Sequence, residues 1–376
     1  MTRAGGPLRL LQVNTTPGWR GGEGQTYFLC RGLVERGHDV LLAAAPKDEL
    51  FRRASQAGVA ARGVRIRGDG DVFGIAALGA IVAGFRPHLI HLHTSRAHAA
   101  GWTLSFAFPR IPLVVSRRVD FAPARDALTR SKYMSRVARY IAVSDRVAEV
   151  LAESGVDRRR IRRVYSGVPP RARTSTSARD ALRASLGLAP DSIAIGTVGA
   201  LAEHKDPMTL LAAFARVRSR HARARLLFFG DGELREGLLR EAARTGLADS
   251  VILAGFRDDP LDCISALDIF VAPSYLEGLN TSLLDAMSLE LPIVAARAGG
   301  MPELVSDAET GLLATARDAA SIADAIERLM LDAALAARLA AAAKSRAAAF
   351  SETRMIDETL DVYEEVLAEK ERDDAG

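Results

Sequence analysis

The chain has little cysteine, no long hydrophobic run and no recognisable signal peptide. Only Cys30 and Cys263 occur in its 376 residues, far apart and with no metal-ligand spacing around them, so we expect two buried thiols in a reducing compartment. The most apolar long stretch, residues 72–85, is interrupted by glycines and is shorter than the roughly 20 residues that span a membrane. The first residues lack the apolar segment of a signal peptide. We therefore expect a cytoplasmic protein.

Two common nucleotide-binding signatures are also missing. No G-x-x-x-x-G-K-[ST] phosphate loop occurs in the chain. The glycine-rich stretch NTTPGWRGGEGQ follows an expected strand, but the next strand ends in AAAP, where nicotinamide-binding folds place an acid. Glycines before a helix do let backbone N–H groups approach an anion. This loop is therefore only a weak signal for phosphate binding.

What the chain does have is an uneven distribution of charge. Residues 1–170 hold 27 Lys and Arg against 13 Asp and Glu, whereas residues 171–376 hold 23 against 33. A basic half is typical of a surface that meets an anion, such as a phosphate-bearing acceptor, a membrane surface or the acidic half of the same chain. The basic segments TRSKYMSRVARY and RRRIRR are candidates for weak contact with anionic lipid. Solvated, scattered arginines are the alternative interpretation.

Short apolar runs alternate with segments of helical period, which is typical of βαβ units and parallel sheets. The pattern predicts helices at 24–36, at 316–348 and at the terminal segment 352–370, and a linker-like break after Pro170. We therefore predict two doubly wound, Rossmann-like α/β domains, residues 1–170 and 171–350, followed by a helical segment, 351–376. The predicted strands are 8–14, 39–45, 64–66, 89–92, 113–116, 140–143, 163–165, 193–198, 226–229, 251–253, 269–272 and 293–295.

Such folds bind ligands at the carboxyl ends of their strands, and two loops there carry cationic or titratable residues. In HLIHLHTSRAH we expect His91 and His93 to point to opposite faces of the sheet, so that His93 alone reaches a ligand and the pair does not bind a metal. In VGALAEHKDP, Lys205 precedes a helix with Pro207 in its first turn, where its ammonium can lie beside a phosphate. A structural histidine and a solvated lysine are the alternatives.

The stretch APSYLEGLNTSLLDAM contains two carboxylates around the start of a helix. Asn280 or Thr281 can cap this helix, which leaves Glu277 in the loop and Asp285 about a turn and a half inside. Glu277 can then accept hydrogen bonds from sugar hydroxyls, and Asp285 can bind the vicinal diol of a ribose. The helix N-terminus between them suits a pyrophosphate. The pair Gly299-Gly300, after the next strand, favours this interpretation over a merely acidic loop.

These residues resemble glycosyltransferase family 4, whose members are retaining enzymes that use nucleotide sugars and have the GT-B fold. The resemblance implies two Rossmann-like domains that face each other across a cleft, the first on the acceptor side and the second binding the donor, with the terminal helix packing back on the first. It runs along nearly the whole chain, through the glycine pair 21–22 and the blocks ERGHDV, PHLIHLH, YIAVSDRVAEVL, IRRVYSGV, TVGALAEHKD, GFRDDP, ALDIFVAPSYLEGLNTSLLDAM and PIVAARAGGMPELV.

The resemblance also implies roles for individual residues. Glu277 matches an acid that contacts hydroxyls of the donor sugar, Asp285 one that binds the ribose, and Lys205 a lysine that neutralises the leaving diphosphate. His93 matches a histidine near the transferring sugar, so Glu277, Lys205 and His93 are the catalytic candidates. The implied donor-binding set is Gly21, Gly22, Gly199, Lys205, Gly230, Glu277, Gly278, Leu279, Asn280, Thr281 and Asp285.

Neither a metal nor a cofactor other than the donor is expected. The letters Asp69-Gly70-Asp71 fit the D-x-D pattern of metal-dependent transferases, but they lie in a connection rich in Gly and Arg rather than after a convincing strand. A lysine, backbone amides and a helix N-terminus can stabilise a leaving diphosphate without a metal.

The chain departs from the family pattern at several positions. Asp285 stands where Glu is usual, and Ala200 where an arginine is usual. One phosphate-facing charge is then either absent or supplied from elsewhere, for which we consider Arg20, Arg117 and Arg118. Pro169 and Glu290 replace a common Asp and a common Gly.

We thus predict a hexosyltransferase-type enzyme that moves a sugar, with retention and without a metal, from a nucleotide-diphosphate sugar to a glycan, lipid-linked or small-molecule acceptor in cell-envelope or polysaccharide biosynthesis. Weak contact with the inner face of an anionic membrane is part of this expectation, and nucleic acid is not expected as a partner. Two alternatives remain: a sugar-nucleotide epimerase on the same fold, and a non-catalytic nucleotide-sugar-binding protein.

Overall fold

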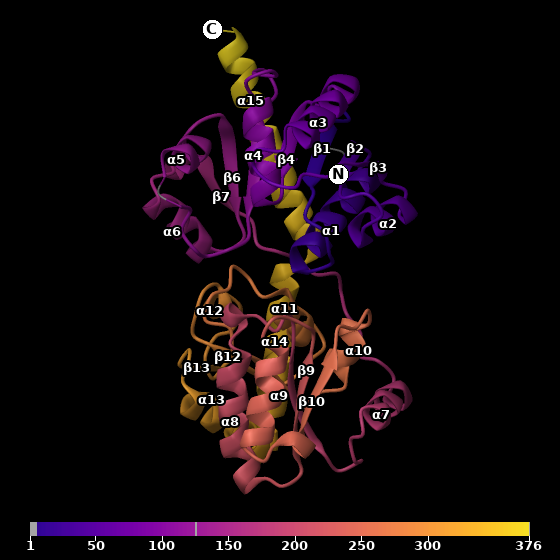
Figure 1. Ribbon diagram of the computed structural model, residues 1–376, viewed down its shortest axis with the longest axis vertical. Helices are drawn as coiled ribbons and strands as arrows, with labels where there is room; N and C mark the ends of the chain where they lie inside the picture. Colours follow the sequence, from indigo (N-terminus) through magenta and orange to yellow (C-terminus); the bar gives the residue numbers. More distant parts are fainter. Residues whose placement is uncertain (1–5, 125, 376) are drawn as a thin grey trace. The chain divides into compact units, whose positions relative to one another are not determined.

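The structure is a computed structural model that describes residues 6–124 and 126–375. These residues form two units, each built on its own parallel sheet (Figure 1). One unit contains the described residues up to Gly167 together with those from Glu352 onward, and the other runs from Val168 to Ser351. The boundaries predicted from the sequence, after residues 170 and 350, differ from these by three residues and one residue.

The first unit is built around a seven-stranded parallel sheet in the order β3-β2-β1-β4-β5-β6-β7. Its strands are β1 (Arg9–Asn14), β2 (Asp39–Ala44), β3 (Ala60–Gly63), β4 (Leu89–Leu92), β5 (Leu113–Arg117), β6 (Val137–Ala142) and β7 (Ile161–Arg163). Its helices are α1 (Gly21–Glu35), α2 (Glu49–Gln56), α3 (Val72–Phe85), α4 (Ser95–Leu104), α5 (Ala127–Met134), α6 (Asp145–Glu153), the 3-10 turn η1 (Arg158–Arg160) and α15 (Glu352–Ala375).

The second unit repeats this plan with a six-stranded sheet in the order β10-β9-β8-β11-β12-β13. Its strands are β8 (Ile193–Val198), β9 (Ala224–Phe229), β10 (Val251–Gly255), β11 (Ile269–Ala272), β12 (Ile293–Ala296) and β13 (Leu312–Ala314). Its helices are α7 (Thr176–Ser185), α8 (Pro207–Arg220), α9 (Arg235–Arg244), α10 (Pro260–Ser265), α11 (Thr281–Ser288), α12 (Met301–Leu304), α13 (Ala319–Leu331) and α14 (Ala333–Ala347), with 3-10 turns η2 (Glu203–Lys205), η3 (Ala248–Ser250) and η4 (Ala348–Phe350).

Both sheets reverse their strand order at one point, between β1 and β4 in the first and between β8 and β11 in the second. The helical connections on either side of such a point diverge to opposite faces, which opens a crevice at the carboxyl ends of the two strands. Two doubly wound, Rossmann-like α/β units were predicted from the sequence, and the sheets confirm them. Each unit therefore has one place where a ligand is expected on topological grounds alone.

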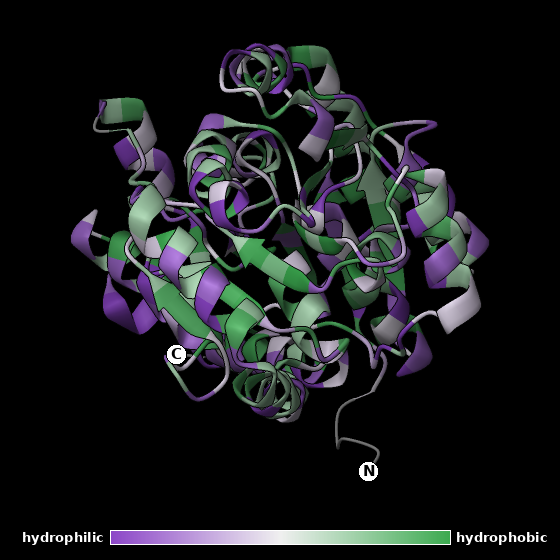
Figure 2. Cartoon of the chain, turned by 90° about the horizontal axis from the view of Figure 1, so that it is seen from below, coloured by the Kyte–Doolittle hydropathy of each residue, from purple (hydrophilic) through white to green (hydrophobic). Residues whose placement is uncertain are grey.

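The strands are apolar because helices cover both faces of each sheet. In β1, for example, Leu10, Leu11 and Val13 are completely buried. Figure 2, coloured by hydropathy, shows mostly green strands and helices of mixed colour. None of the described helices combines the length and the apolar character needed to cross a bilayer. Cys30 and Cys263 are free and buried, as predicted.

Helix α15 belongs to the first unit although it follows the second in the sequence. Its apolar face, including Ile356 and Tyr363, is part of the core beneath α1 and β1. Two acids of α15 form ion pairs with the rest of the unit: Glu352 with Arg31 at 2.5 Å and Glu369 with Arg139 at 2.5 Å. Burial of the apolar face provides most of the stabilisation, because ion pairs with an exposed partner contribute little.

Some predicted elements were misplaced. The strand predicted at 64–66 lies instead at Ala60–Gly63, because β3 is a largely exposed edge strand, whereas the apolar Val64 and Ile66 are buried in the connection that follows. The strand predicted at 163–165 lies at Ile161–Arg163. The short strand β13 was missed, and the segment 316–348 is two helices, separated at Asp332, which caps the second by accepting a hydrogen bond from Leu335.

The polar run after Pro170 is not a free linker. Arg173 donates from Nε to the Leu289 carbonyl at 2.8 Å, and Thr174 donates to the Asp262 carboxylate. Helix α7 begins at Thr176, with Ser175 as its cap. The segment is therefore fastened to the second unit.

Candidate functional site

The structure brings Lys205 and Glu277 together in the second unit. Lys205 ends η2, in the connection after β8, and Glu277 lies in the loop after β11, the neighbouring strand in the sheet. The Lys205 ammonium and Oε2 of Glu277 form an ion pair, and the two side chains are 27% and 12% exposed. An ammonium and a carboxylate thus meet at the point where this sheet reverses its order. That is the position expected for a ligand.

Glycines let the loops around this pair pack backbone to backbone. The φ angles of Gly199 and Gly230 are +157° and +147°. A Cβ at Gly230 would lie 1.8 Å from the Gly199 carbonyl oxygen, so no other residue fits there. The Gly230 N–H donates to the Gly255 carbonyl at 2.8 Å. On the other loop, Gly278 and Leu279 are buried.

Helix α11 starts beside the pair and has a well-formed cap. The Asn280 side chain accepts a hydrogen bond from the Leu283 N–H at 3.0 Å, so Asn280 rather than Thr281 is the cap. The carbonyl of Glu277 accepts a hydrogen bond from the Gly300 N–H at 2.9 Å. The backbone of the loop is therefore held at Glu277 and at Asn280, and the Glu277 carboxylate extends from this fixed backbone to Lys205.

Asp285 forms an ion pair with an arginine, Arg171, that the sequence did not indicate. Arg171 donates from Nε to Oδ1 of Asp285 at 2.9 Å, and the two side chains are only 18% and 15% exposed. Burial raises the pKa of the Asp285 carboxyl, and the charge and hydrogen bond of Arg171 oppose that rise. The carboxylate predicted to bind ribose is thus held in place by a guanidinium 114 residues earlier in the chain.

The expectation that His91 and His93 diverge is wrong. Their ring centroids lie 4.0 Å apart, because residues two apart along an extended chain point to the same face. Both side chains are buried, and burial is the main cause that lowers both pKa values well below the ordinary range of histidine. Both rings are therefore neutral at pH 7.

A chain of hydrogen bonds sets the tautomers of these rings. Nε2 of His93 lies 2.8 Å from Oε1 of Gln12, and the Gln12 amide donates to the Tyr363 hydroxyl at 3.1 Å. That hydroxyl lies 2.6 Å from Nδ1 of His91, whose Nε2 lies 2.8 Å from the Ser116 hydroxyl. Because an amide oxygen only accepts, Nε2 of His93 carries the proton and its Nδ1 presents a lone pair.

Three buried polar atoms at this edge of the first sheet have no hydrogen-bond partner among the described residues: Oδ1 of Asn14, Oγ1 of Thr15 and Nδ1 of His93. Asn14 ends β1, Thr15 follows it, and His93 follows the neighbouring β4. Buried polar atoms in native structures are normally satisfied, so three at a topological switch point indicate a place for the hydroxyls of a ligand. In the sequence, the polar residues Asn14-Thr15-Thr16 at the end of the first apolar strand could have indicated these two binding candidates, Asn14 and Thr15.

The glycine pair lies at the start of α1, which begins at Gly21 rather than at the predicted residue 24. Of the three arginines considered as replacements at position 200, Arg118 lies beside this pair, since its Cδ would be 3.6 Å from a Cβ at Gly22. Burial lowers the pKa of Arg118 to about 10. Arg117 instead donates to the Tyr133 hydroxyl at 2.9 Å and to the Phe121 carbonyl at 2.5 Å.

The two acids of the D-x-D pattern, Asp69 and Asp71, have structural roles. Asp71 caps α3, accepting hydrogen bonds from the N–H groups of Gly74 at 3.0 Å and Arg67 at 2.9 Å. Asp69 pairs with the Lys132 ammonium at 3.3 Å. Across residues 6–124 and 126–375, no group of three or more His, Cys, Asp or Glu side chains is arranged to hold a metal ion.

The chain is similar to known proteins both in sequence and in fold. A family model described as "Glycosyltransferase Family 4" matches residues 19–172, and one described as "Glycosyl transferases group 1" matches residues 178–346. D-inositol 3-phosphate glycosyltransferase of Saccharomonospora viridis is 29% identical over 74% of this chain and 70% of its own length. The enzyme of the same name from Rhodococcus erythropolis is 30% identical over 73% of this chain and 67% of its own length.

Among solved structures, HepE of Anabaena in complex with UDP-glucose is similar over 95% of this chain and 100% of its own, with a TM-score of 0.85 and 20% identity. At that identity the likeness concerns the fold. Both sequence relatives are named for the transfer of a glycosyl group.

Proposed function

We propose a specific reaction for this chain, which belongs to glycosyltransferase family 4 and has the GT-B fold: transfer of a sugar, with retention and without a metal, from a nucleotide-diphosphate sugar to a hydroxyl of an acceptor. That the chain is a glycosyltransferase follows from its family. UDP-glucose is the first donor to test, because the structural relative HepE binds it.

The observation that carries the proposal is the Lys205–Glu277 pair at the switch point of the second sheet. When a donor enters, its diphosphate competes for the Lys205 ammonium, and the Glu277 carboxylate then accepts hydrogen bonds from the sugar. Charge develops on the leaving diphosphate in the transition state, and an ammonium already in position stabilises it at little reorganisation cost. Catalysis then depends on groups that are placed before the reaction begins.

Asp285 completes the donor site in this proposal. One oxygen of its carboxylate accepts from Arg171, and the other is available for a ribose hydroxyl. Burial raises the pKa of this carboxyl, and the charge and hydrogen bond of Arg171 oppose that rise and so favour the ionised form. We infer that Arg171 positions the ribose-binding group rather than binding the ribose itself.

His93 is the group proposed for the first unit. Its neutral ring presents Nδ1 as an acceptor without a partner among the described residues, which suits a hydroxyl of the transferring sugar or of the acceptor. The acceptor itself is proposed as a hydroxyl compound of cell-envelope or polysaccharide biosynthesis. The names of the two relatives support a small phosphorylated polyol as the first acceptor to test.

Membrane contact is a separate part of the proposal. The basic segments give it little support, because Lys132 is buried against Asp69 and Arg162 and Arg163 pair with acids. Its better support is the start of α3, where Val72 and Phe73 are 67% and 85% exposed. Flotation with vesicles containing acidic lipid tests it: Phe73→Ser is expected to reduce the bound fraction.

The experiment for the main proposal is a thermal-shift screen of UDP-, GDP- and ADP-sugars followed by product analysis. A ligand that binds only the folded state raises Tm by mass action, so one nucleotide class is expected to shift Tm. Transfer to an acceptor supports the proposal. Isomerisation of the donor alone would instead identify an epimerase, and tight binding without nucleotide release would identify a binding protein.

A further inference from the structure

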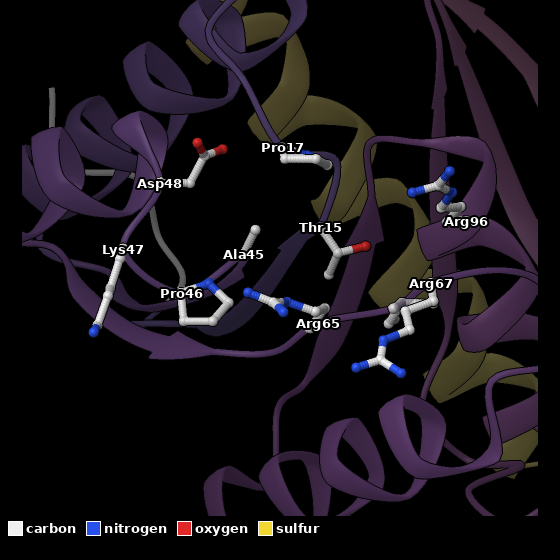
Figure 3. Close-up of a pocket in the computed structure, with 10 residues that line it drawn as sticks. Thr15, Pro17, Ala45, Pro46, Lys47, Asp48, Arg65, Arg67 and Arg96 are labelled. Atoms are coloured by element: carbon white, nitrogen blue, oxygen red, sulfur yellow. The ribbon is translucent and has the colours of Figure 1, made fainter.

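The first unit contains a cavity of about 440 Å³ at the carboxyl ends of β1 and β2 (Figure 3). Its lining includes Thr15, Ala45, Asp48, Arg65, Arg67 and Arg96. These residues come from the loops after β1 and β2, the connection from β3 to α3 and the first turn of α4. Four different segments thus contribute to one cavity, which Thr15, with its hydroxyl unpartnered in the described part of the chain, also lines.

The charge of this cavity is strongly positive. No ion pair involves Arg65, Arg67 or Arg96 within residues 6–124 and 126–375, whereas elsewhere in the fold Arg139 and Arg183 pair with carboxylates. All three side chains belong to exposed residues, and in Figure 3 they lie around Thr15, while Lys47 points away. Like charges held together repel each other unless an anion lies between them.

Acidic groups near the cavity are engaged by backbone amides. Oδ2 of Asp48 accepts from the Gly18 N–H at 2.7 Å. Asp71, next to the cavity, accepts from the N–H groups of Arg67 and Gly74. The hydrogen bonds from Arg67 and Gly74 lower the pKa of Asp71, and the charge of Arg67 adds to this effect. In the part of the chain that the structure describes, neither carboxylate lies within ion-pair distance of the three guanidinium groups.

A second observation points to a ligand independently of charge. Thr15 is 2% exposed, lines the cavity, and its Oγ1 is buried without a partner among the described residues. A buried hydroxyl left unsatisfied is unfavourable, and a ligand oxygen in the cavity would satisfy it. Arginine forks and a hydroxyl donor together match the several oxygens of a phosphate group.

We propose that this cavity binds a phosphate group of the acceptor, through Arg65, Arg67, Arg96 and the Thr15 hydroxyl. The inference rests on the proposed function and adds to it the site and the residues that would recognise a phosphorylated acceptor. The volume suits a phosphorylated compound of hexose size, since pockets for small ligands occupy about 300–1,000 Å³. The phosphate belongs either to a soluble phosphomonoester or to a lipid headgroup, and the same residues would recognise both.

The test measures binding of glycerol 3-phosphate to the full chain by calorimetry, and of phosphatidylcholine vesicles with and without phosphatidic acid by flotation. Charge-assisted hydrogen bonds contribute enough that each of Arg65→Gln, Arg67→Gln and Arg96→Gln is expected to weaken phosphate binding about tenfold. Thr15→Val should weaken it severalfold. Arg62→Gln is the matched control, because Arg62 is an exposed arginine on β3 that does not line the cavity.

Binding of the soluble phosphomonoester with this dependence on arginine supports the proposal and indicates a soluble acceptor. Binding of phosphatidic acid vesicles alone, with the same dependence, supports it and indicates a lipid-borne acceptor. The proposal is overturned when neither probe binds, or when Arg62→Gln weakens binding as much as the cavity variants. No donor is present, so failure of the donor reaction would not affect this result, and a chain that binds phosphate but releases no nucleotide would contradict the proposed function alone.

Discussion

The hydroxyl of Tyr363, in the last helix of the chain, lies 2.6 Å from Nδ1 of His91, 272 residues earlier in the sequence. The same hydroxyl accepts a hydrogen bond from Gln12, whose carbonyl oxygen fixes the tautomer of His93. A helix that follows the second unit thus helps to set the proton positions at the switch point of the first.

Tyr363→Phe removes this hydroxyl and leaves two buried partners without it. We expect a loss of about 1–3 kcal/mol in the free energy of unfolding, which is the cost of unsatisfied buried groups. Urea denaturation measures it. Tyr165→Phe is the control, because its hydroxyl makes an exposed contact with Asp145, and its loss should stay within about 0.5 kcal/mol. Equal effects of the two variants would contradict the buried network.

The Asp285 carboxylate is expected to bind the nucleotide rather than to stabilise the fold. Asp285→Asn removes the negative charge that faces Arg171 and replaces one carboxylate oxygen by an NH2 donor, and we expect about a tenfold weaker Kd for the free nucleotide diphosphate. Asp285→Glu restores the charge and should recover most of the affinity. Calorimetric titration measures both. The assignment fails when the Asn variant binds the nucleotide as tightly as the parent.

Three buried, neutral histidines make the first unit sensitive to acid. Burial lowers the pKa of His98 to about 3, and lowers those of His91 and His93 well below their usual range. Unfolded histidines have a pKa of about 6.5, so the unfolded state binds more protons below that pH. The stability that these neutral histidines contribute is therefore fully present above about pH 6.5. It is lost as the pH falls towards the pKa values that the histidines have in the folded state.

His98→Phe isolates one of these contributions. Between pH 7 and pH 5.5, one neutral buried histidine costs about 1.2 kcal/mol of stability, so the drop in unfolding free energy should be smaller by about that amount in the variant. The raised pKa values of Glu23 and Asp285 act in the opposite sense, but they are common to both proteins and cancel. The same drop in parent and variant would mean that His98 is protonated in the folded state.

Gly230 is predicted to tolerate no side chain. In Gly230→Ala the new Cβ meets the Gly199 carbonyl oxygen, 1.8 Å away in the present backbone, at a φ of +147°. We expect a loss of at least about 3 kcal/mol, since both loops must move. In Gly237→Ala, within α9, a Cβ meets nothing within 4 Å, and the change should stabilise by about 0.5–1 kcal/mol. Thermal unfolding compares them; a stable Gly230→Ala would contradict the close approach of the loops.

The sequence predicted the parts of the fold and site that leave local signals. Apolar runs between helical segments correctly predicted the positions of most strands. Lys205 and Glu277 could be predicted as site candidates because each lies in a connection between a buried strand and a helix. The edge strand β3 was misplaced because its residues are mostly exposed and carry no apolar pattern. The direction of His91 and His93 was mispredicted because the alternation of side chains along a strand was applied wrongly.

Contacts between distant segments left no such signal. Arg171 and Asp285 are 114 residues apart, and Tyr363 and His91 272 apart. Nothing in the sequence around Arg171 distinguishes it from Arg173, which donates to a backbone carbonyl instead. The roles of these side chains depend on packing, which only the folded chain defines.

The most direct test of the central claim is the rate of nucleotide release from the donor identified by thermal shift, in the presence of acceptor, for Lys205→Ala and Glu277→Gln. Removing the Lys205 ammonium, which is proposed to stabilise the leaving charge, is expected to lower kcat by about 10²–10³. Removing the Glu277 charge, which is proposed to hold the sugar, is expected to lower kcat as well, and Tm should change little in both variants. Lys344→Ala serves as the control, because Lys344 forms an exposed ion pair with Glu290 in the same unit. If Lys205→Ala and Glu277→Gln turned over as fast as Lys344→Ala, the donor site would lie elsewhere.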